Sequence, residues 1–365
     1  MDKIKILHGN VFDKIKELNE NSIDCVVTSP PYWGLRDYGT GTWIGGDKNC
    51  PHKRLTKISK DTKTGHAGMF KKGNVVGDAI YKKYCPECGA KRKDEQLGLE
   101  ETYQEHIKNI VNLFEEIKPK LKESATIWLN YGDSYSNGKR TSTTNQTLRG
   151  NKNYGVTRTP VQEGIKEKDL VMIPNRIAIA LQDAGWYIRS EIIWHKPNPM
   201  PESVRDRPTS AHEKIWLITK SKKYYYDADA IREPVAQGTI TRLSEKNLKN
   251  QKGSTRGNGG MKSNGNMKAV GNMETKNKRN VWTVTTKPCK EAHFATFPKD
   301  LIEPCIKAGC PEGGIVLDPF GGSGTTGIVA SQNNRNAILI ELNKDYIDIA
   351  NKRIHKELGL FNVKS

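Results

Sequence analysis

Apolar positions recur along the chain in two rhythms, which predict alternating strands and helices. Short continuous apolar runs predict buried strands, and apolar residues three and four apart predict amphipathic helices. The expected strands are residues 3–7, 23–27, 125–129, 186–194, 214–219, 314–317 and 337–340, with 224–226 as a hairpin partner. The expected helices are residues 103–117, 174–184, 325–332 and 344–358. This alternation predicts an α/β fold with a mostly parallel sheet covered on both faces.

A glycine-rich turn follows the apolar run at residues 314–317 and reads Asp318-Pro319-Phe320-Gly321-Gly322-Ser323-Gly324. Gly322 and Gly324 let the backbone turn tightly and approach a ligand. The next strand ends in Glu341, 19 residues after Gly322, close to the roughly 20 expected for an acid that hydrogen-bonds a ribose hydroxyl. A turn that binds nothing is the alternative, but the spacing of Glu341 favours a nucleoside cofactor.

A second rigid turn, Thr28-Ser29-Pro30-Pro31-Tyr32, follows the apolar run at residues 23–27. Two prolines fix φ and remove two N–H donors, so the Ser29 hydroxyl and the Pro30 carbonyl stand in a rigid frame beside the flat Tyr32 ring. Such a frame can hold a planar amine, although in isolation a stiff turn is the preferred interpretation. Both turns come at strand ends, where open α/β sheets keep their ligands.

With these two motifs the chain resembles the S-adenosylmethionine-dependent DNA amino-methyltransferases, which methylate the exocyclic amine of cytosine or adenine. The catalytic motif precedes the cofactor motif, as in the circularly permuted β group of that family, whose target-recognition segment lies between them. Residues 293–301 resemble the family's additional cofactor-contacting stretch, and residues 192–201 and 212–226 resemble later strands of its sheet. The resemblance implies a Rossmann-like methyltransferase domain formed by residues 1–232 and 279–358.

The resemblance also implies roles for individual residues. Ser29 and Pro30 would accept hydrogen bonds from the target amine, Pro31 would stiffen the loop, and Tyr32 would stack on a base flipped out of the duplex. The implied S-adenosylmethionine contacts are Asp318, Phe320, Gly322, Gly324, Glu341, Phe297, Pro298 and Asn10. Serine before Pro-Pro-Tyr is typical of N4-cytosine enzymes, so N4 of cytosine is the expected target and N6 of adenine the alternative.

Positive charge is concentrated in three segments of the chain. The net charge is +18, and residues 51–93, 136–168 and 235–280 contribute +9, +5 and +8, which leaves the remainder at −4. Such clusters suit the phosphate backbone of double-stranded DNA, whereas solvated loops that keep the protein soluble are the alternative. Residues 235–280 contain seven glycines and no aromatic residue, a composition that cannot order itself. We expect residues 233–280 to be a target-recognition region that orders on DNA, with a plain linker as the alternative.

Cysteine and histidine residues in the basic insert at residues 44–97 form a candidate zinc site. Three thiolates and one imidazole, from Cys50, His52, Cys85 and Cys88, would complete a tetrahedral site. The Cys-x-x-Cys-Gly turn is a typical zinc knuckle, but Cys-x-His is a short ligand spacing, so incidental cysteines in a surface loop are the alternative. The remaining cysteines, Cys25, Cys289, Cys305 and Cys310, are expected to be buried as small apolar side chains.

Location and partners follow from what the sequence lacks. No apolar run approaches the roughly 18 residues of a membrane span, and residues 1–3 do not resemble an export signal, so we expect a cytoplasmic protein without membrane contact. A cognate restriction enzyme is a candidate partner.

Two other functional classes are alternatives. Protein-glutamine methyltransferases have the cofactor motif first and Asn before the prolines, so the motif order of this chain disfavours them. Non-catalytic zinc-dependent DNA-binding proteins would not explain Glu341 or the Pro-Pro-Tyr loop.

Overall fold

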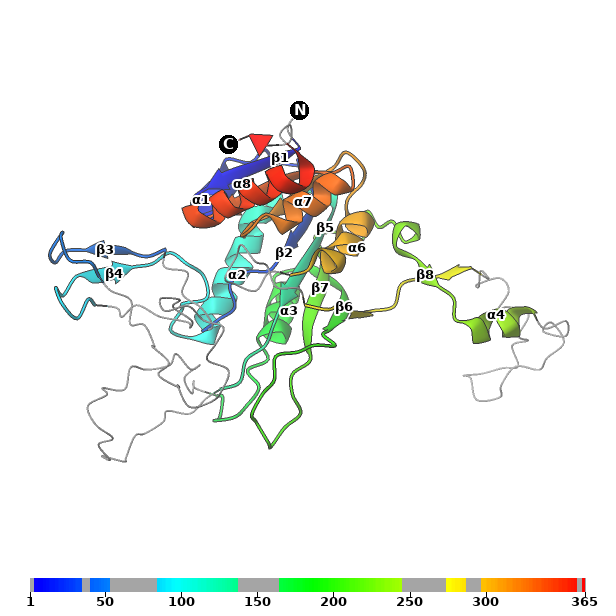
Figure 1. The fold of residues 1–365 in the computed structure, drawn as a ribbon, viewed down its shortest axis with the longest axis horizontal. Coiled ribbons are helices and arrows are strands. Elements are labelled where there is room, and N and C mark those ends of the chain that lie inside the picture. The colour runs from blue at the N-terminus through cyan, green and yellow to red at the C-terminus, as the bar shows by residue number, and fades with distance from the viewer. Residues whose placement is uncertain are drawn as a thin grey trace.

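A nine-stranded sheet forms the centre of the protein (Figure 1). The structure, a computed structural model, describes residues 3–34, 40–52, 84–136, 164–244, 274–286, 297–359 and 363–364. The strand order is β10-β6-β7-β5-β2-β11-β12-β1-β13. These strands are β1 Ile4–His8, β2 Ile23–Thr28, β5 Leu121–Tyr131, β6 Tyr187–His195, β7 His212–Thr219, β10 Val281–Thr283, β11 Ile315–Asp318, β12 Asn336–Glu341 and β13 Val363–Lys364. β7 runs antiparallel to both neighbours and the other pairs are parallel, so the predicted mostly parallel α/β fold is confirmed.

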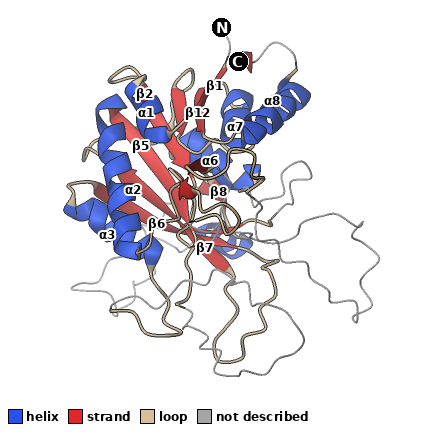
Figure 2. Cartoon of the chain, turned by 90° about the vertical axis from the view of Figure 1, so that its left-hand side faces the viewer, coloured by secondary structure: helices blue, strands red, loops and turns tan. Residues whose placement is uncertain are grey.

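Helices cover both faces of this sheet (Figure 2). One face carries α1 Val11–Lys16, α2 Tyr103–Ile117 and α3 Ile173–Asp183, and the other carries α6 Lys299–Gly309, α7 Thr325–Gln332 and α8 Lys344–Leu358. In β2, Val26 packs in the core beneath α1, α2 and α3, whereas Cys25 and Val27 pack in the core on the opposite face. Ile23 packs in the same core as Val26, because the strand register shifts between Ile23 and Cys25. Because successive strand side chains point to opposite faces, this continuous apolar run builds two cores at once.

The local sequence determines where helix α2 begins and which of its faces is buried. Thr102 caps the helix by accepting a hydrogen bond from the Glu105 amide at 3.1 Å, which satisfies one of the free N–H groups of the first turn. Ile110, Leu113 and Ile117 are buried at helical spacing against the sheet. The helix has the predicted bounds.

Some sequence-based expectations were wrong. Residues 224–226 do not form a hairpin strand, because both edges of β7 are already paired, with β5 and with β6. In the candidate recognition region, where the composition predicted no order, α4 Gln237–Ser244 is helical, and β8 Glu233–Pro234 pairs with β9 Thr275–Lys276. Residues 245–273, which hold most of the expected DNA-reading loop, lie outside the described residues.

Two smaller parts extend from opposite sides of the sheet domain (Figure 1). On one side β3 Thr42–Ile44 and β4 Lys91–Lys93 form an antiparallel ribbon within the predicted insert. On the other side lie β8 and α4. Short 3-10 turns, Lys118–Lys120 and Asp229–Ile231, precede β5 and β8. The predicted domain boundaries stay a prediction, although β10 places residues 281–283 in the main sheet.

Candidate active site

A cavity of about 660 Å³ opens at the edge where the parallel strands end. β2 and β11 are neighbours at the centre of the sheet. The chain continues from β2 to β5 on one side and from β11 to β12 on the other, so the strand order reverses between β2 and β11. Open α/β sheets bind ligands at such a switch point. The cavity brings together these expected site residues: Asn10, Ser29, Pro30, Pro31, Tyr32, Phe297, Asp318, Phe320, Gly322 and Glu341.

Asp318 joins the two motifs. Its carboxylate accepts hydrogen bonds from the Thr28 hydroxyl at 2.8 Å, from the Thr326 hydroxyl at 2.6 Å and from the Phe320 amide at 3.1 Å. Burial raises the pKa of Asp318 to about 6, against the opposing effect of these donors. The side chain expected to contact the cofactor therefore also holds the end of β2 against the glycine turn.

Glu341 lines the cavity, where two backbone amides hold its carboxylate. Its carboxylate accepts from the Gly322 amide and from the Asn343 amide, both at 2.8 Å. Burial raises the pKa of Glu341, although the two amides oppose the shift. Asn10 stands at the neighbouring wall, where its Oδ1 accepts from the Phe12 amide at 2.9 Å and so caps α1.

Gly324 and Pro298 lie outside the cavity lining. Gly324 has a φ of +80° at the start of α7, and a Cβ added there would lie 3.1 Å from the Cβ of Ala350. This glycine therefore permits the close packing of α7 on α8. Pro298 is the N-cap residue of α6. The cofactor contacts expected of these two residues stay a prediction.

The Tyr32 ring is fixed by contacts on several sides. Its hydroxyl donates to Glu213 Oε2 at 2.7 Å and accepts from the Ser29 hydroxyl at 3.3 Å. Its ring lies against Tyr131, with centroids 4.6 Å apart, and a Cβ on Gly132 would come within 2.7 Å of it. Burial and the nearby Glu213 carboxylate raise the pKa of Tyr32. Tyr32 therefore stays protonated and can donate to Glu213.

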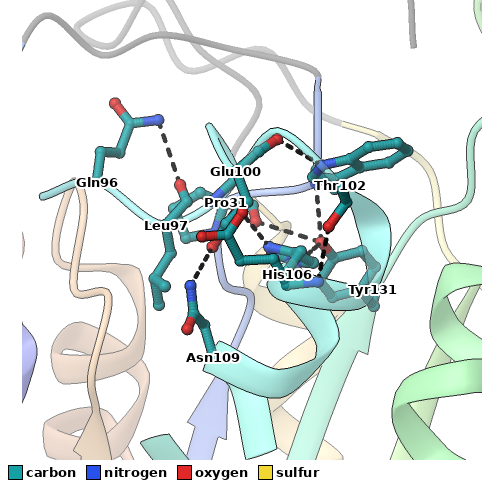
Figure 3. Close-up of polar contacts among 11 residues, drawn as sticks. Pro31, Gln96, Leu97, Glu100, Thr102, His106, Asn109 and Tyr131 are labelled. Carbon is teal, nitrogen blue, oxygen red and sulfur yellow. Dashed lines mark hydrogen bonds and ion pairs between the residues drawn. The ribbon is translucent and has the colours of Figure 1, made fainter. Parts of the chain in front are cut away.

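A buried polar network contacts the loop at Pro31 and Trp33 (Figure 3). The Tyr131 hydroxyl accepts from the Trp33 amide at 2.9 Å and lies 2.6 Å from His106 Nε2 and 3.3 Å from the Pro31 carbonyl. His106 Nδ1 lies 2.8 Å from Glu100 Oε2. Burial raises the pKa of Glu100, but its hydrogen bond and charge interaction with His106 outweigh burial, so the net shift is downward. Because an ionised Glu100 only accepts, His106 Nδ1 donates to it.

Sequence reasoning missed the residues on the far side of the cavity. Glu213 at the start of β7 forms an ion pair with Lys196, which follows β6, and accepts from Asn130 Nδ2 at 3.2 Å. Trp194 lines the same wall. Each of these residues lies near a strand end, and that position is the signal by which the sequence could have identified them. Glu213, however, lies at the start of β7, and only the antiparallel direction of β7 brings it to the cavity.

The expected metal ligands also come together, away from this cavity. Cys50, His52, Cys85 and Cys88 lie near the β3–β4 ribbon with their ligand atoms within 4.8 Å of one another. The other cysteines that the structure describes are Cys25, Cys305 and Cys310, and all three are buried, as predicted. Cys289 lies outside the described residues.

The three basic segments that we expect to contact DNA are only partly described. Residues 53–83, 137–163 and 245–273 lie outside the described parts of the three basic segments. Among the helices that the structure describes, each is too short or too polar to cross a membrane.

Comparison with known proteins gives a consistent family. The N6/N4 methyltransferase family, described as DNA methylase, matches residues 23–352. Over 353 residues the chain is 37% identical to Type II methyltransferase M.SmaI of Serratia marcescens, covering 96% of this chain and 90% of that protein. Over 352 residues it is 38% identical to Type II methyltransferase M.Cfr9I of Citrobacter freundii, covering 96% and 88%.

A solved structure shares the fold. PvuII DNA methyltransferase (cytosine-N4-specific) superposes with a TM-score of 0.54 at 16% identity, covering 100% of this chain and 89% of that one. At this identity the likeness shows a common Rossmann-like methyltransferase fold.

Proposed function

The chain belongs to the S-adenosylmethionine-dependent DNA amino-methyltransferases of the N6/N4 family, and we propose that it methylates N4 of a cytosine flipped out of duplex DNA. The observation that carries the proposal is the single cavity that holds both the Ser-Pro-Pro-Tyr loop and the glycine turn with Glu341. Its volume of about 660 Å³ falls within the range of roughly 300–1,000 Å³ typical of ligand pockets. The Glu341 carboxylate lines this cavity and can accept hydrogen bonds from ribose hydroxyls, so it fits a nucleoside cofactor.

The cofactor side of the cavity would hold S-adenosylmethionine, which supplies an electrophilic methyl group on its sulfonium. Glu341 would accept hydrogen bonds from the ribose hydroxyls, because the Gly322 and Asn343 amides hold its carboxylate in place. Phe320 and Phe297 supply apolar walls, and Asn10 a polar edge. Asp318 would act chiefly by holding the glycine turn beside the catalytic loop.

The catalytic side would position the base. The Ser29 hydroxyl and the Pro30 carbonyl would accept the two N–H groups of the amine, and Tyr32 would stack on the ring. These contacts aim the nitrogen lone pair at the methyl carbon, so catalysis rests mainly on positioning and fixed dipoles.

A proton must leave the amine as the N–C bond forms. The hydroxyl of Ser29 donates to Tyr32, and that of Tyr32 donates to Glu213, so both hydrogen bonds point away from the base toward a carboxylate. We propose that the Ser29 oxygen takes the amine proton while the Ser29 proton passes to Tyr32 and the Tyr32 proton passes to Glu213. No side chain forms a covalent intermediate in this scheme.

Nucleoside mass spectrometry of DNA methylated by the purified protein tests the target base. We expect N4-methylcytosine, because serine precedes Pro-Pro-Tyr. N6-methyladenine alone would overturn the base assignment, and the absence of any methylated amine would contradict the reaction. A Ser29→Ala variant is the control: it should bind S-adenosylmethionine normally and methylate on the order of 10² more slowly, as expected for loss of one positioned polar group.

The remaining parts of the proposal are the DNA-contacting segments, the location of the protein and its partner enzyme. We propose that residues 233–280 and the basic segments contact duplex DNA around the flipped base, and that the protein acts in the cytoplasm. The names of the relatives, Type II methyltransferases, support a cognate restriction endonuclease as partner. DNA from cells that express the protein should resist that endonuclease, and cutting at unchanged rates would refute the pairing.

A further inference from the structure

We propose that Cys50, His52, Cys85 and Cys88 bind one structural zinc ion, and that this ion fixes one wall of the active-site cavity. Two of the four ligands come before residues 53–83 and two come after them. The metal would thus join two chain segments at the β3–β4 ribbon. This is a site separate from the methyl-transfer chemistry.

The distances between ligand atoms match a tetrahedral zinc site. With Zn–S bonds of about 2.3 Å and Zn–N bonds of about 2.05 Å, tetrahedral angles place two sulfurs about 3.8 Å apart and a sulfur and a nitrogen about 3.6 Å apart. The Sγ atoms of Cys50 and Cys85 are 3.7 Å apart, and Cys88 Sγ is 3.6 Å from His52 Nδ1. A disulfide would need about 2.05 Å. Three thiolates and one imidazole favour zinc over harder cations such as Mg²⁺ or Ca²⁺.

The backbone around the ligands is shaped to bring them together. In the Cys85–Gly89 turn, the Gly89 amide donates to the Cys85 carbonyl at 2.9 Å, and Gly89 has a φ of +71°. Gly46 lies directly against the cluster, where an added Cβ would be 2.9 Å from Cys88 Sγ. His52 has a φ of +39°, a costly conformation for a residue with a side chain, and its ring stacks on Trp43 with centroids 4.6 Å apart.

The ribbon connects this cluster to the active-site cavity. β3 and β4 pair from Ile44–Lys91 to Thr42–Lys93. At the other end of the ribbon, Asp94 Oδ1 accepts from the Thr40 hydroxyl at 3.0 Å and from the Gln96 amide at 3.1 Å. Thr40 and Gln96 line the cavity, together with Glu95 and Leu97.

The same segment then runs into the support of the catalytic loop. Glu95 accepts from Asn10 Nδ2 at 3.2 Å on the cofactor side. On the catalytic side, the Gly98 carbonyl accepts from the Gly34 amide at 2.9 Å, and a Cβ on Gly98 would lie 3.0 Å from the Tyr32 carbonyl. An ion that holds the two ribbon strands in register would therefore hold this wall. Because four protein ligands fill the coordination sphere, the ion has no open position for catalysis.

Metal analysis of protein purified without chelators tests the site. We expect about one zinc per chain, lost in a Cys85→Ser/Cys88→Ser variant and retained in Cys305→Ala, a matched control whose buried thiol lies in α6. Cobalt(II) loaded in place of zinc should give the absorption bands of a tetrahedral thiolate complex. Wild-type protein without bound metal, or full zinc content in the double variant, would overturn the site.

Hydrogen exchange measured by mass spectrometry tests the effect on the wall without relying on methyl transfer. Stripping zinc from the wild-type protein with a chelator should speed exchange in a peptide spanning residues 91–98 on the order of ten-fold, as expected for local loss of protection. A peptide from α7 should be unchanged, and adding zinc back should restore protection. Unchanged exchange in residues 91–98 after the zinc is gone would refute the mechanical role and leave the metal site standing.

Discussion

Replacing Tyr131 with Phe tests whether the buried network positions the catalytic loop. The change removes one hydroxyl and leaves the ring that supports Tyr32. The lost hydroxyl meets the Trp33 amide at 2.9 Å and His106 Nε2 at 2.6 Å, and the Tyr131 side chain is only 1% exposed. The hydroxyl is therefore shielded from bulk water.

The expected size of the effect follows from those two contacts. A buried polar group left without a partner costs about 1–3 kcal/mol, and two such groups that share one hydroxyl should together cost about 2–4 kcal/mol in free energy of unfolding. The loop that carries Ser29 and Tyr32 also loses its anchor. A displaced amine acceptor should then slow methyl transfer on the order of 10².

Urea unfolding and single-turnover methylation measure the two effects separately. A Tyr224→Phe variant is the matched control, because its hydroxyl accepts from Arg189 at the surface at 3.1 Å, and surface changes stay within about 0.5 kcal/mol. S-adenosylmethionine affinity should be nearly unchanged in Tyr131→Phe. If Tyr131→Phe unfolds and methylates like the control, the network does not position the loop.

Three further changes probe the carboxylates. Glu341→Ala should weaken S-adenosylmethionine binding by at least about ten-fold, the loss expected for a charged hydrogen bond; titration calorimetry that finds wild-type affinity would exclude the ribose contact. Glu213→Gln should lower single-turnover methylation by on the order of 10² with unchanged cofactor affinity, whereas a wild-type rate would exclude Glu213 as the proton acceptor. The pKa of Asp318 is about 6 in the folded protein and roughly 3.9 in an unfolded chain. The folded protein therefore binds this proton more tightly, and its free energy of unfolding falls as the pH rises from about 4 to about 6. In Asp318→Asn this loss, measured by urea unfolding, should shrink by up to about 3 kcal/mol, and identical pH profiles would contradict it.

The sequence predicted those parts of the fold that depend on local pattern. Helix α2 kept its predicted bounds because a capping threonine and apolar residues at helical spacing are both visible in the sequence. Helix α6 was missed because Pro304 lies inside it and proline reads as a helix breaker. Strand β10 has three residues, too few to show a period.

Among the candidate site residues, too, those set by local sequence were predicted and those set by the fold were missed. The two loops were predicted because each carries its chemistry in consecutive residues, and the structure places both in one cavity. Glu213 could not be predicted, because its role depends on strand order and on β7 running antiparallel. His106 could not be predicted either: on a helix it looks like one more core residue until Tyr131 is placed beside it.

The hydrogen bond between Thr28 and Asp318 has a consequence for the time at which the protein becomes active. It joins residues 290 positions apart, and contacts of such long sequence separation form late because the whole intervening chain must first be brought together. During synthesis Thr28 emerges 290 residues before Asp318. An unfinished chain therefore carries Ser29 and Tyr32 without the turn that would present a methyl donor to them. We therefore expect the newly made protein to modify DNA only once the turn that begins at Asp318 has folded onto β2.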